Sequence, residues 1–225
     1  MGKRARSSMM RTMGHGSPAR RSDTVLLEAW RGGDASAGEE LCERHYGSVE
    51  RFLINKVGPE QAVDLAQQTF VACLEARDRI TTSFRAYLLS TAFHVVCHHF
   101  RARYRRAAAF DPDEVCLRDE APSPSAHAVR TQEQRLLLEA LRAIPFKYQT
   151  MLELHYWEDL STLEIAAVLE IPSGTVRSRL QRARAALEAE MSALARSRTV
   201  LESTLTRLED WAARCRGELD DSARS

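Results

Sequence analysis

Apolar side chains recur at the spacing of an α-helix through most of this sequence, and no segment alternates apolar and polar residues as a strand does. The helical pattern runs from residue 23 to about 106, with breaks at 32–33 and 58–59 where glycine or proline interrupts it. It resumes at about residue 129. The sequence therefore predicts an all-α protein.

The 225 residues are enough for two small helical domains joined by a linker. We expect, in chain order, a disordered basic tail (1–22), a first helical domain (23–106), an acidic, proline-rich flexible linker (107–128), a helix-turn-helix domain (129–188) and a long C-terminal helical extension (189–225). Proline in the linker segments DPDE and APSPSA favours an extended path over a packed element.

The C-terminal extension has a heptad pattern, because its apolar residues follow one another at alternating steps of three and four. They are Leu187, Met191, Leu194, Leu201, Leu205, Leu208, Ala212, Cys215 and Leu219. The simpler interpretation is packing against the second domain. Pairing with another helix, or with a regulator, stays open.

Charge is segregated along the chain. The 32 Lys and Arg residues nearly balance the 31 Asp and Glu residues, so the net charge of +1 alone argues against a nucleic-acid partner. Arginines nevertheless cluster at 101–106 and again at 177–184, with an acidic segment at 111–120 between them. Two basic patches separated by acid fit a molecule that touches nucleic acid at two places.

The five cysteines are odd in number and scattered, which predicts free thiols in a reducing cytoplasm. No secretory signal precedes them, and no apolar run approaches the length that spans a membrane. The sequence predicts a cytoplasmic protein without a membrane partner.

The segment STLEIAAVLEIPSGTVRSRLQRARAAL, which begins at Ser161, predicts a helix-turn-helix. Ser161 and Glu164 form an S-x-x-E capping box, and Leu160 with Ile165 is placed as a hydrophobic staple. Glu170 stands at the turn where glycine is common, so we expect a left-handed conformation there.

The second helix of this motif contains no acidic residue through Leu187 and carries its arginines outward. Val176 and Leu180 are expected to face the core. An arginine-rich surface helix is the plainer interpretation, but it accounts neither for the cap and staple nor for the small Ala166 at the crossing. We therefore predict a recognition helix whose DNA-contacting residues are Ser173, Thr175, Arg177, Ser178, Arg179, Gln181 and Arg182.

Three motifs resemble the extracytoplasmic-function group of the sigma-70 family of bacterial RNA polymerase sigma factors. LLLEALRAIPFKYQTMLELHYWEDLSTLEIAAVLEIPSGTVRSRLQRARAAL is similar to the family's −35-reading domain, VDLAQQTF at 63–70 to its polymerase-docking helix, and FRAYLLSTAFHVVCHHFRARYRR at 84–106 to its promoter-melting helix. The resemblance covers about residues 23–188. It implies a non-enzymatic factor that binds core polymerase, recognises −10 and −35 elements and helps melt the promoter.

In the docking helix, Val63, Ala66, Phe70 and Cys73 repeat at core spacing. This interpretation leaves a leucine beside polar groups on the outward face. With the resemblance, the expected polymerase contacts are Asp64, Leu65 and Gln68.

Melting DNA requires planar side chains that replace base stacking and cations along the exposed strand. The planar side chains of the melting segment are Phe84, Tyr87, Phe93, His94, His98, His99 and Tyr104. Core packing must use some of the rings, and we assign Phe93 and Phe100 mainly to the interior. The resemblance places a pocket for a flipped −10 base at 78–83. The expected −10 contacts are Arg79, Thr81, Thr82, Ser83, Tyr87, His94, His98, Arg101, Arg103 and Arg105. The acidic linker resembles one that enters the polymerase channels, although a plain tether explains its composition equally well.

A metal site at His94, Cys97, His98 and His99 is not predicted, because no carboxylate or second ligand cluster accompanies them. The sequence contains no nucleophile–base pair, P-loop or dinucleotide fingerprint, so neither an enzyme nor a cofactor is predicted. The expected partners are bacterial RNA polymerase core, promoter DNA and an anti-sigma factor. The competing hypothesis is a stand-alone helix-turn-helix regulator that does not bind polymerase core.

Overall fold

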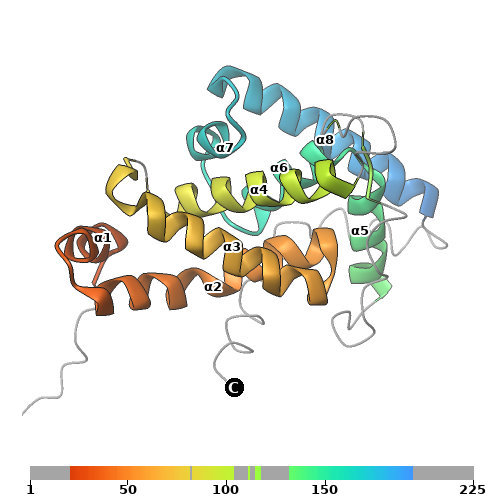
Figure 1. Cartoon of the computed structure of the whole chain (residues 1–225). Coiled ribbons are helices and arrows are strands. Elements are labelled where there is room, and N and C mark those ends of the chain that lie inside the picture. The colour runs from red at the N-terminus through yellow and green to blue at the C-terminus, as the bar shows by residue number, and fades with distance from the viewer. Residues whose placement is uncertain (1–20, 82, 104–110, 112–114, 118–131, 195–225) are drawn as a thin grey trace, which may run out of the picture.

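The computed structural model describes residues 21–81, 83–103, 111, 115–117 and 132–194. Within these residues every regular element is helical, which confirms the all-α prediction (Figure 1). The elements are α1 (Asp23–Arg31), α2 (Ala35–Val57), α3 (Pro59–Ala76), the 3-10 helix η1 (Arg77–Arg79), α4 (Phe84–Arg103), α5 (Gln132–Ala143), α6 (Phe146–Tyr156), α7 (Thr162–Leu169) and α8 (Ser173–Leu194). None of these helices is both long enough and apolar enough to cross a bilayer.

Helices α1 to α4 form the N-terminal bundle, in which α2, α3 and α4 pack together and α1 covers one end (Figure 1). The predicted breaks are confirmed, since α1 and α2 flank Gly33 at φ 99° and α2 and α3 flank Gly58 at φ 83°. Both are left-handed conformations that glycine adopts without steric cost. Gly38 of α2 allows a close helix crossing, because an added Cβ there would overlap the Trp30 side chain of α1.

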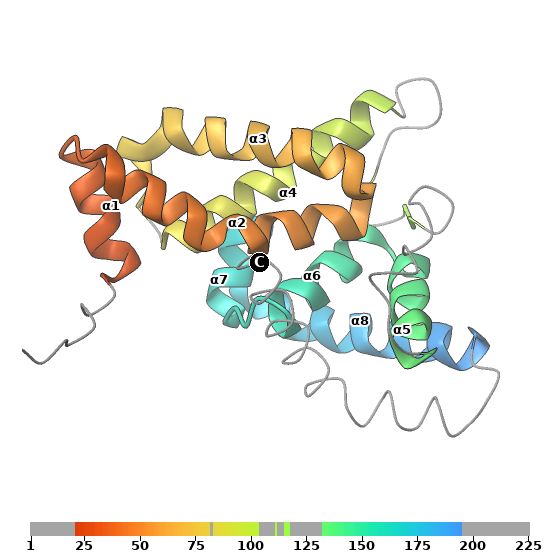
Figure 2. The same ribbon diagram turned by 90° about the horizontal axis from the view of Figure 1, so that it is seen from below.

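Helices α5 to α8 form the C-terminal bundle, in which α8 contacts each of the other three. Turned by 90°, the molecule shows this bundle lying along one side of the N-terminal bundle (Figure 2). Helices α4 and α7 form the most extensive helix contact between the two bundles. The second half is therefore packed on the first rather than held apart from it.

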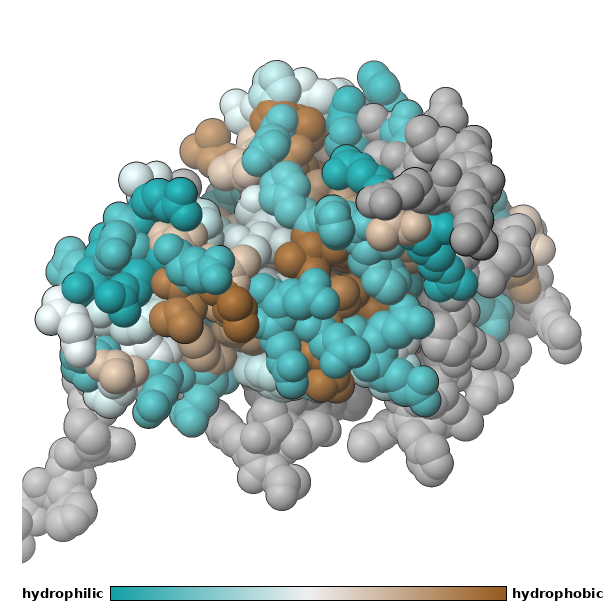
Figure 3. Space-filling view, viewed as in Figure 1, coloured by the Kyte–Doolittle hydropathy of each residue, from teal (hydrophilic) through white to brown (hydrophobic). Residues whose placement is uncertain are grey.

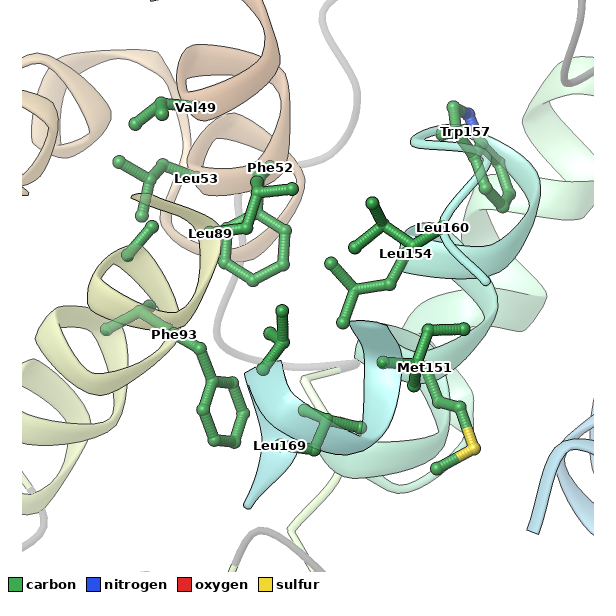
Figure 4. Close-up of a cluster of buried hydrophobic side chains, with 14 of the residues drawn as sticks. Val49, Phe52, Leu53, Leu89, Phe93, Met151, Leu154, Trp157, Leu160 and Leu169 are labelled. Carbon is green, nitrogen blue, oxygen red and sulfur yellow. The ribbon is translucent and has the colours of Figure 1, made fainter. Parts of the chain in front are cut away.

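Apolar side chains from both bundles form one continuous core (Figure 4). Phe93 of α4 stacks on Phe146 of α6, with ring centroids 5.9 Å apart, and Phe100 meets the same ring edge-on at 5.7 Å. Phe93 and Phe100 are both buried, as predicted. Their rings therefore pack between the two bundles.

Part of the expected linker is packed. Leu117 is fully buried, and the Phe146 N–H donates to the Val115 carbonyl at 2.7 Å. The expectation of an extended, unpacked path therefore does not hold for residues 115–117, because an apolar side chain and backbone hydrogen bonding tie them to the start of α6. The rest of the linker other than Asp111, residues 1–20 of the N-terminal tail and the extension beyond Leu194 lie outside the described residues.

The capping box predicted for α7 is confirmed. The Ser161 hydroxyl accepts from the Glu164 N–H at 3.3 Å, and the Glu164 carboxylate accepts from the Ser161 N–H at 2.9 Å. Leu160 and Ile165 are both buried at the predicted staple positions. The first helix of the motif thus begins where the sequence indicates.

Glu170 follows α7 with φ 53° and ψ 43°, the predicted left-handed conformation. This conformation costs a residue with a side chain about 1 kcal/mol, and glycine avoids that cost. We expect Glu170→Gly to raise the melting temperature by about 2–4 °C. The change also removes the exposed contact between Glu170 and His94, which contributes little to stability.

Glu170→Ala is the matched control for this prediction, because it removes the carboxylate and keeps a Cβ. It should give no stabilisation. Equal melting temperatures for the glycine and alanine variants in thermal denaturation would contradict a backbone origin.

Candidate nucleic-acid and polymerase interface

The predicted recognition helix is the first part of α8, which begins at Ser173. Val176 and Leu180 are buried and fix the helix on the core. The predicted DNA contacts that are exposed are Ser173, Arg177, Ser178, Gln181 and Arg182, whereas Thr175 and Arg179 are half-buried. The exposed side chains recur at steps of one, three and four residues, so they share one outward face.

Arg184 lies on the same helix but leans towards α6. Its guanidinium is 5.3 Å from the centre of the Tyr156 ring and 3.4 Å from the His155 side chain. This contact orients the arginine along the bundle. The cationic surface thus extends to Arg184, two residues beyond the last predicted contact.

Along α4, Tyr87, His94, His98 and Arg101 follow one another at helical steps of three, four and seven residues and therefore share a face. The two histidines and Arg101 are exposed, and Tyr87 is half-buried. Arg103 is also exposed, but its position in the helical turn places it on another side. Arg105 lies outside the described residues.

The face of α4 that carries Tyr87, His94, His98 and Arg101 is here called the α4 stripe. Part of it contacts the C-terminal bundle. The His94 imidazole Nε2 lies 3.2 Å from a carboxylate oxygen of Glu170, which follows α7 of the C-terminal bundle. A carboxylate at this position repels phosphate. In this arrangement the stripe is partly covered by the other predicted DNA-binding element.

The segment before α4 carries the remaining predicted −10 contacts. Arg79, Thr81 and Ser83 are exposed, whereas Thr82 lies outside the described residues. The Ser83 hydroxyl accepts from the Ala86 N–H at 3.2 Å, which places Ser83 as a cap of α4.

Arg31 is a positioning residue that the sequence interpretation missed. Its guanidinium reaches from α1 and donates to the carbonyl oxygens of Arg77, at 3.1 Å, and of Ile80. It thereby holds the η1 segment against the N-terminal bundle. A lone arginine at the end of a helix gives no sequence signal for such a long-range contact.

One predicted polymerase contact is wrong. Leu65 is buried at 4% exposure inside the N-terminal bundle, whereas Asp64 and Gln68 are exposed as expected. The buried positions of α3 are Ala62, Leu65, Ala66, Thr69, Cys73 and Ala76. The inward face is thus rotated by about one residue from the predicted one, and Val63, which was assigned to the core, is 43% exposed.

Exposed apolar residues on α3 are the functional candidates that this rotation reveals. Val71 and Leu74 are 54% and 51% exposed and lie on the outward side with Asp64 and Gln68. Apolar patches interrupt an otherwise hydrophilic surface on the face shown in Figure 3. Half-exposed apolar side chains beside polar ones are typical of a protein-binding surface.

The cysteine and histidines of α4 do not form a ligand cluster. Burial raises the pKa of the Cys97 thiol to about 12, so the thiolate that binds a metal is disfavoured. Burial, with Arg103 and His98 nearby, lowers the pKa of His99. Among the described residues, no group of three or more potential ligands is close enough to hold a metal ion.

Charged side chains are buried where the two bundles meet. The Lys56 ammonium of α2, with 0% exposure, donates to the Glu153 carboxylate of α6 and to the Phe52 carbonyl at 3.0 Å. Burial lowers the pKa of Lys56, and the neighbouring Glu153 opposes this shift. The sequence shows these residues only as single charges within apolar runs.

Glu158, just after α6, is a second buried carboxylate at this contact, with its side chain 3% exposed. It accepts from Arg85 of α4 at 2.8 Å and from Arg51 of α2 at 3.4 Å. Both arginines belong to the N-terminal bundle. Lys56, Glu153, Glu158, Arg51 and Arg85 together form the interbundle charge cluster.

The fold and this surface define a helical DNA-binding protein that carries a helix-turn-helix and a second cationic helix. Two family models match the chain, Sigma-70 region 2 over residues 41–106 and Sigma-70, region 4 over residues 134–187. The chain therefore belongs to the sigma-70 family of RNA polymerase sigma factors, in its extracytoplasmic-function group.

Relatives and solved structures agree with this assignment. The chain is 28% identical over 185 residues to the ECF RNA polymerase sigma-E factor of Salmonella typhimurium, a match that covers 78% of this chain and 97% of that protein. The structure of CnrH in complex with the cytosolic domain of CnrY is similar in fold, with a TM-score of 0.58 at 23% identity over 77% of this chain and 99% of the other. The sigma factor RpoE from Bartonella quintana, solved with the anti-sigma factor NepR, has a TM-score of 0.56 at 20% identity over 70% and 98%.

Proposed function

We propose that the chain directs RNA polymerase to promoters through three separate surfaces, one on each of α3, α4 and α8. The observation that carries this proposal is the presence, on one chain of this family, of an exposed arginine face on α8 and an exposed histidine–arginine face on α4. Two such faces allow two promoter elements to be bound. A stand-alone regulator needs only the first, so the sequence match to region 2 favours the sigma factor.

The α8 face is proposed to read the −35 element. The N-terminal part of a recognition helix lies in the major groove, where arginine and glutamine reach base edges and phosphates. Arg177, Ser178, Gln181 and Arg182 are exposed for this role. Thr175 and Arg179 are half-buried. They fit a role at the margin of the DNA contact, towards the sugar-phosphate backbone of the DNA.

The η1 segment and α4 are proposed to bind the −10 element. Arg79, Thr81 and Ser83 supply hydrogen-bonding groups, and the α4 stripe from Tyr87 to Arg101 supplies rings and positive charge. Stacking on rings and attraction to phosphate are the two interactions that hold an unpaired strand. Thr82 and Arg105 stay proposed contacts outside the described residues.

Asp64, Gln68, Val71 and Leu74 of α3 are the proposed docking surface for core polymerase. The apolar pair provides buried area on binding, and the polar pair fixes orientation. Leu65 supports this surface from inside the bundle. An anti-sigma partner is also proposed, because one structural neighbour is a complex with an anti-sigma factor.

The deciding experiment adds the purified chain to bacterial core polymerase on a template library randomised in the −10 and −35 segments. We expect transcripts only when both proteins are present, with enrichment at both segments. The chain itself is proposed to make no covalent change, so core polymerase should supply all of the chemistry. Tight sequence-specific binding by the chain alone, without stimulation of core polymerase, would support the stand-alone regulator instead.

Arg103 is proposed to contact phosphate without reading sequence. We expect Arg103→Ala to weaken promoter binding by the polymerase complex similarly for all templates. The slope of log affinity against log salt concentration should fall by about 0.9, the contribution of one phosphate on duplex DNA. Arg103→Lys is the control, because it keeps the charge and should keep the slope. An unchanged slope in the alanine variant would contradict a phosphate contact.

A further inference from the structure

The last residue of α1 holds the chain segment between α3 and α4, residues 77–83, which we call the α3–α4 turn. The Arg31 guanidinium donates through Nε to the Arg77 carbonyl, at 3.1 Å, and through a terminal nitrogen to the Ile80 carbonyl. Helix α1 lies beside this turn (Figure 2). One side chain from a distant part of the sequence thus binds two backbone groups of the turn.

Two hydrogen bonds from one guanidinium restrict the turn more than a single contact does. Arg77 and Ile80 are three positions apart, and the exposed side chains of Asp78 and Arg79 lie between them. A guanidinium is a planar fork with fixed donor directions, so it sets both the position and the tilt of the backbone that it binds. Carbonyls at the end of a helix lack partners within that helix, so such donors stabilise the turn that follows α3.

Helix α1 is itself anchored, which makes it a firm support. Trp30 is buried, and an added Cβ at Gly38 of α2 would overlap its ring. The same ring meets Phe84, the first residue of α4, edge-on at 6.1 Å. At the other end of α1, the Asp23 carboxylate accepts from Arg44 of α2 at 2.6 Å. The end of α1 therefore contacts both the α3–α4 turn and the helix that follows it.

The turn that α1 supports carries residues proposed to bind the −10 element. Arg79, Thr81 and Ser83 are exposed there. The Sigma-70 region 2 match spans residues 41–106, which include the turn but not α1. A side chain outside the matched region thus orders a DNA-contacting segment inside it.

We propose that Arg31 is a positioning residue for −10 recognition, an inference that rests on the proposed function of the α3–α4 turn. Arg31 acts through the backbone, holding the turn in the arrangement in which Arg79, Thr81 and Ser83 reach the bases together. Without this support the turn samples other arrangements, and the apparent affinity falls in proportion to the fraction of chains that keep the competent one. The α8 surface belongs to the other bundle and is independent of Arg31.

Hydrogen–deuterium exchange of the full-length chain, without polymerase, measures the order of the turn directly. We expect Arg31→Ala to speed exchange about tenfold in peptides that cover residues 77–86 and to leave α7 and α8 unchanged. Arg21→Ala is the matched control, because this arginine, just before α1, contacts only exposed or half-buried carboxylates. It should leave exchange in residues 77–86 unchanged.

Promoter discrimination by the reconstituted polymerase measures the consequence. We expect Arg31→Ala to lower the affinity ratio between a selected template and one with a scrambled −10 segment by about tenfold, and to leave the ratio for a scrambled −35 segment unchanged. The slope of log affinity against log salt concentration should stay the same, because no phosphate contact is lost. Arg31→Lys keeps the charge and can donate to the turn without the planar fork, so it should recover part of the −10 discrimination.

Unchanged exchange in residues 77–86 of Arg31→Ala would overturn the proposal, and so would faster exchange with full −10 discrimination. A salt slope lowered by about 0.9 would mean that Arg31 contacts phosphate directly, which also contradicts a positioning role. Equal losses at both promoter segments would indicate a general loss of folding and would overturn it too. Should Arg31→Ala fail to fold, Arg31→Lys carries the same comparisons.

Failure of this inference is distinguishable from failure of the proposed function. The exchange experiment uses no polymerase, so it tests the support of the turn by Arg31 alone. If the unmodified chain does not stimulate core polymerase at all, the proposed function is wrong. If the unmodified chain does so and Arg31→Ala keeps its −10 discrimination, only the role of Arg31 is wrong.

Discussion

Replacing Arg177 and Arg182 together with alanine should abolish −35-dependent initiation while leaving the protein folded. Both side chains are exposed on the outward face of α8, so their loss creates no cavity. A specific arginine contact to a base contributes about 1–3 kcal/mol of discrimination, so removal of two should lower promoter affinity about thirtyfold or more. The affinity of the reconstituted polymerase for selected templates measures this loss.

Arg21→Ala is the control for the arginine pair, because it removes an exposed arginine distant in sequence from the helix-turn-helix. It should leave promoter affinity unchanged. Templates with a scrambled −35 segment provide the second control, since they should bind the double variant and the unmodified chain equally. Retention of −35 discrimination by the double variant would exclude α8 as the reader.

The helix-turn-helix could be predicted almost completely from the sequence, because local interactions determine it. The Ser161–Glu164 capping box depends on residues three apart, and the left-handed Glu170 follows from the need to end one helix before Pro172. Local hydrogen bonding and steric exclusion act within a few residues. They are therefore visible in the order of the amino acids.

The docking helix was harder to predict because its two faces have similar composition. α3 carries small or apolar residues on both sides. Choosing Leu65 instead of Val63 as an inward residue rotates the predicted buried face of α3 about the helix axis. Both phases satisfy helical periodicity. Only the packing of α2 and α4 against α3 decides between them.

The contact between the bundles could not be predicted from the sequence. Lys56 and Glu153 are 97 residues apart, and neither residue has a local partner that signals burial. Charged residues are almost never fully buried unless they are paired, so the sequence alone favours exposure for both. Tertiary pairing reverses that expectation.

Phe84→Ala should destabilise the N-terminal bundle by about 3–5 kcal/mol. The sequence offered Phe84 as one of the rings that stack on melted DNA, but its side chain is 1% exposed. Its ring meets Trp30 edge-on at 6.1 Å and lies 5.8 Å from His45, so alanine leaves a cavity between α1, α2 and α4. Chemical denaturation should show a lower midpoint, and the melting temperature should fall by about 6–20 °C.

Phe84→Leu separates the packing role from a role in promoter melting. Leucine keeps most of the apolar volume and should cost less than about 1.5 kcal/mol, but it removes the aromatic ring. If Phe84 acts through packing alone, this variant should open promoters at the rate of the unmodified protein at a temperature where both are folded. Slow promoter opening by a stable leucine variant would support a DNA-contacting role for Phe84. The start of α4 would then have to leave the core during promoter melting.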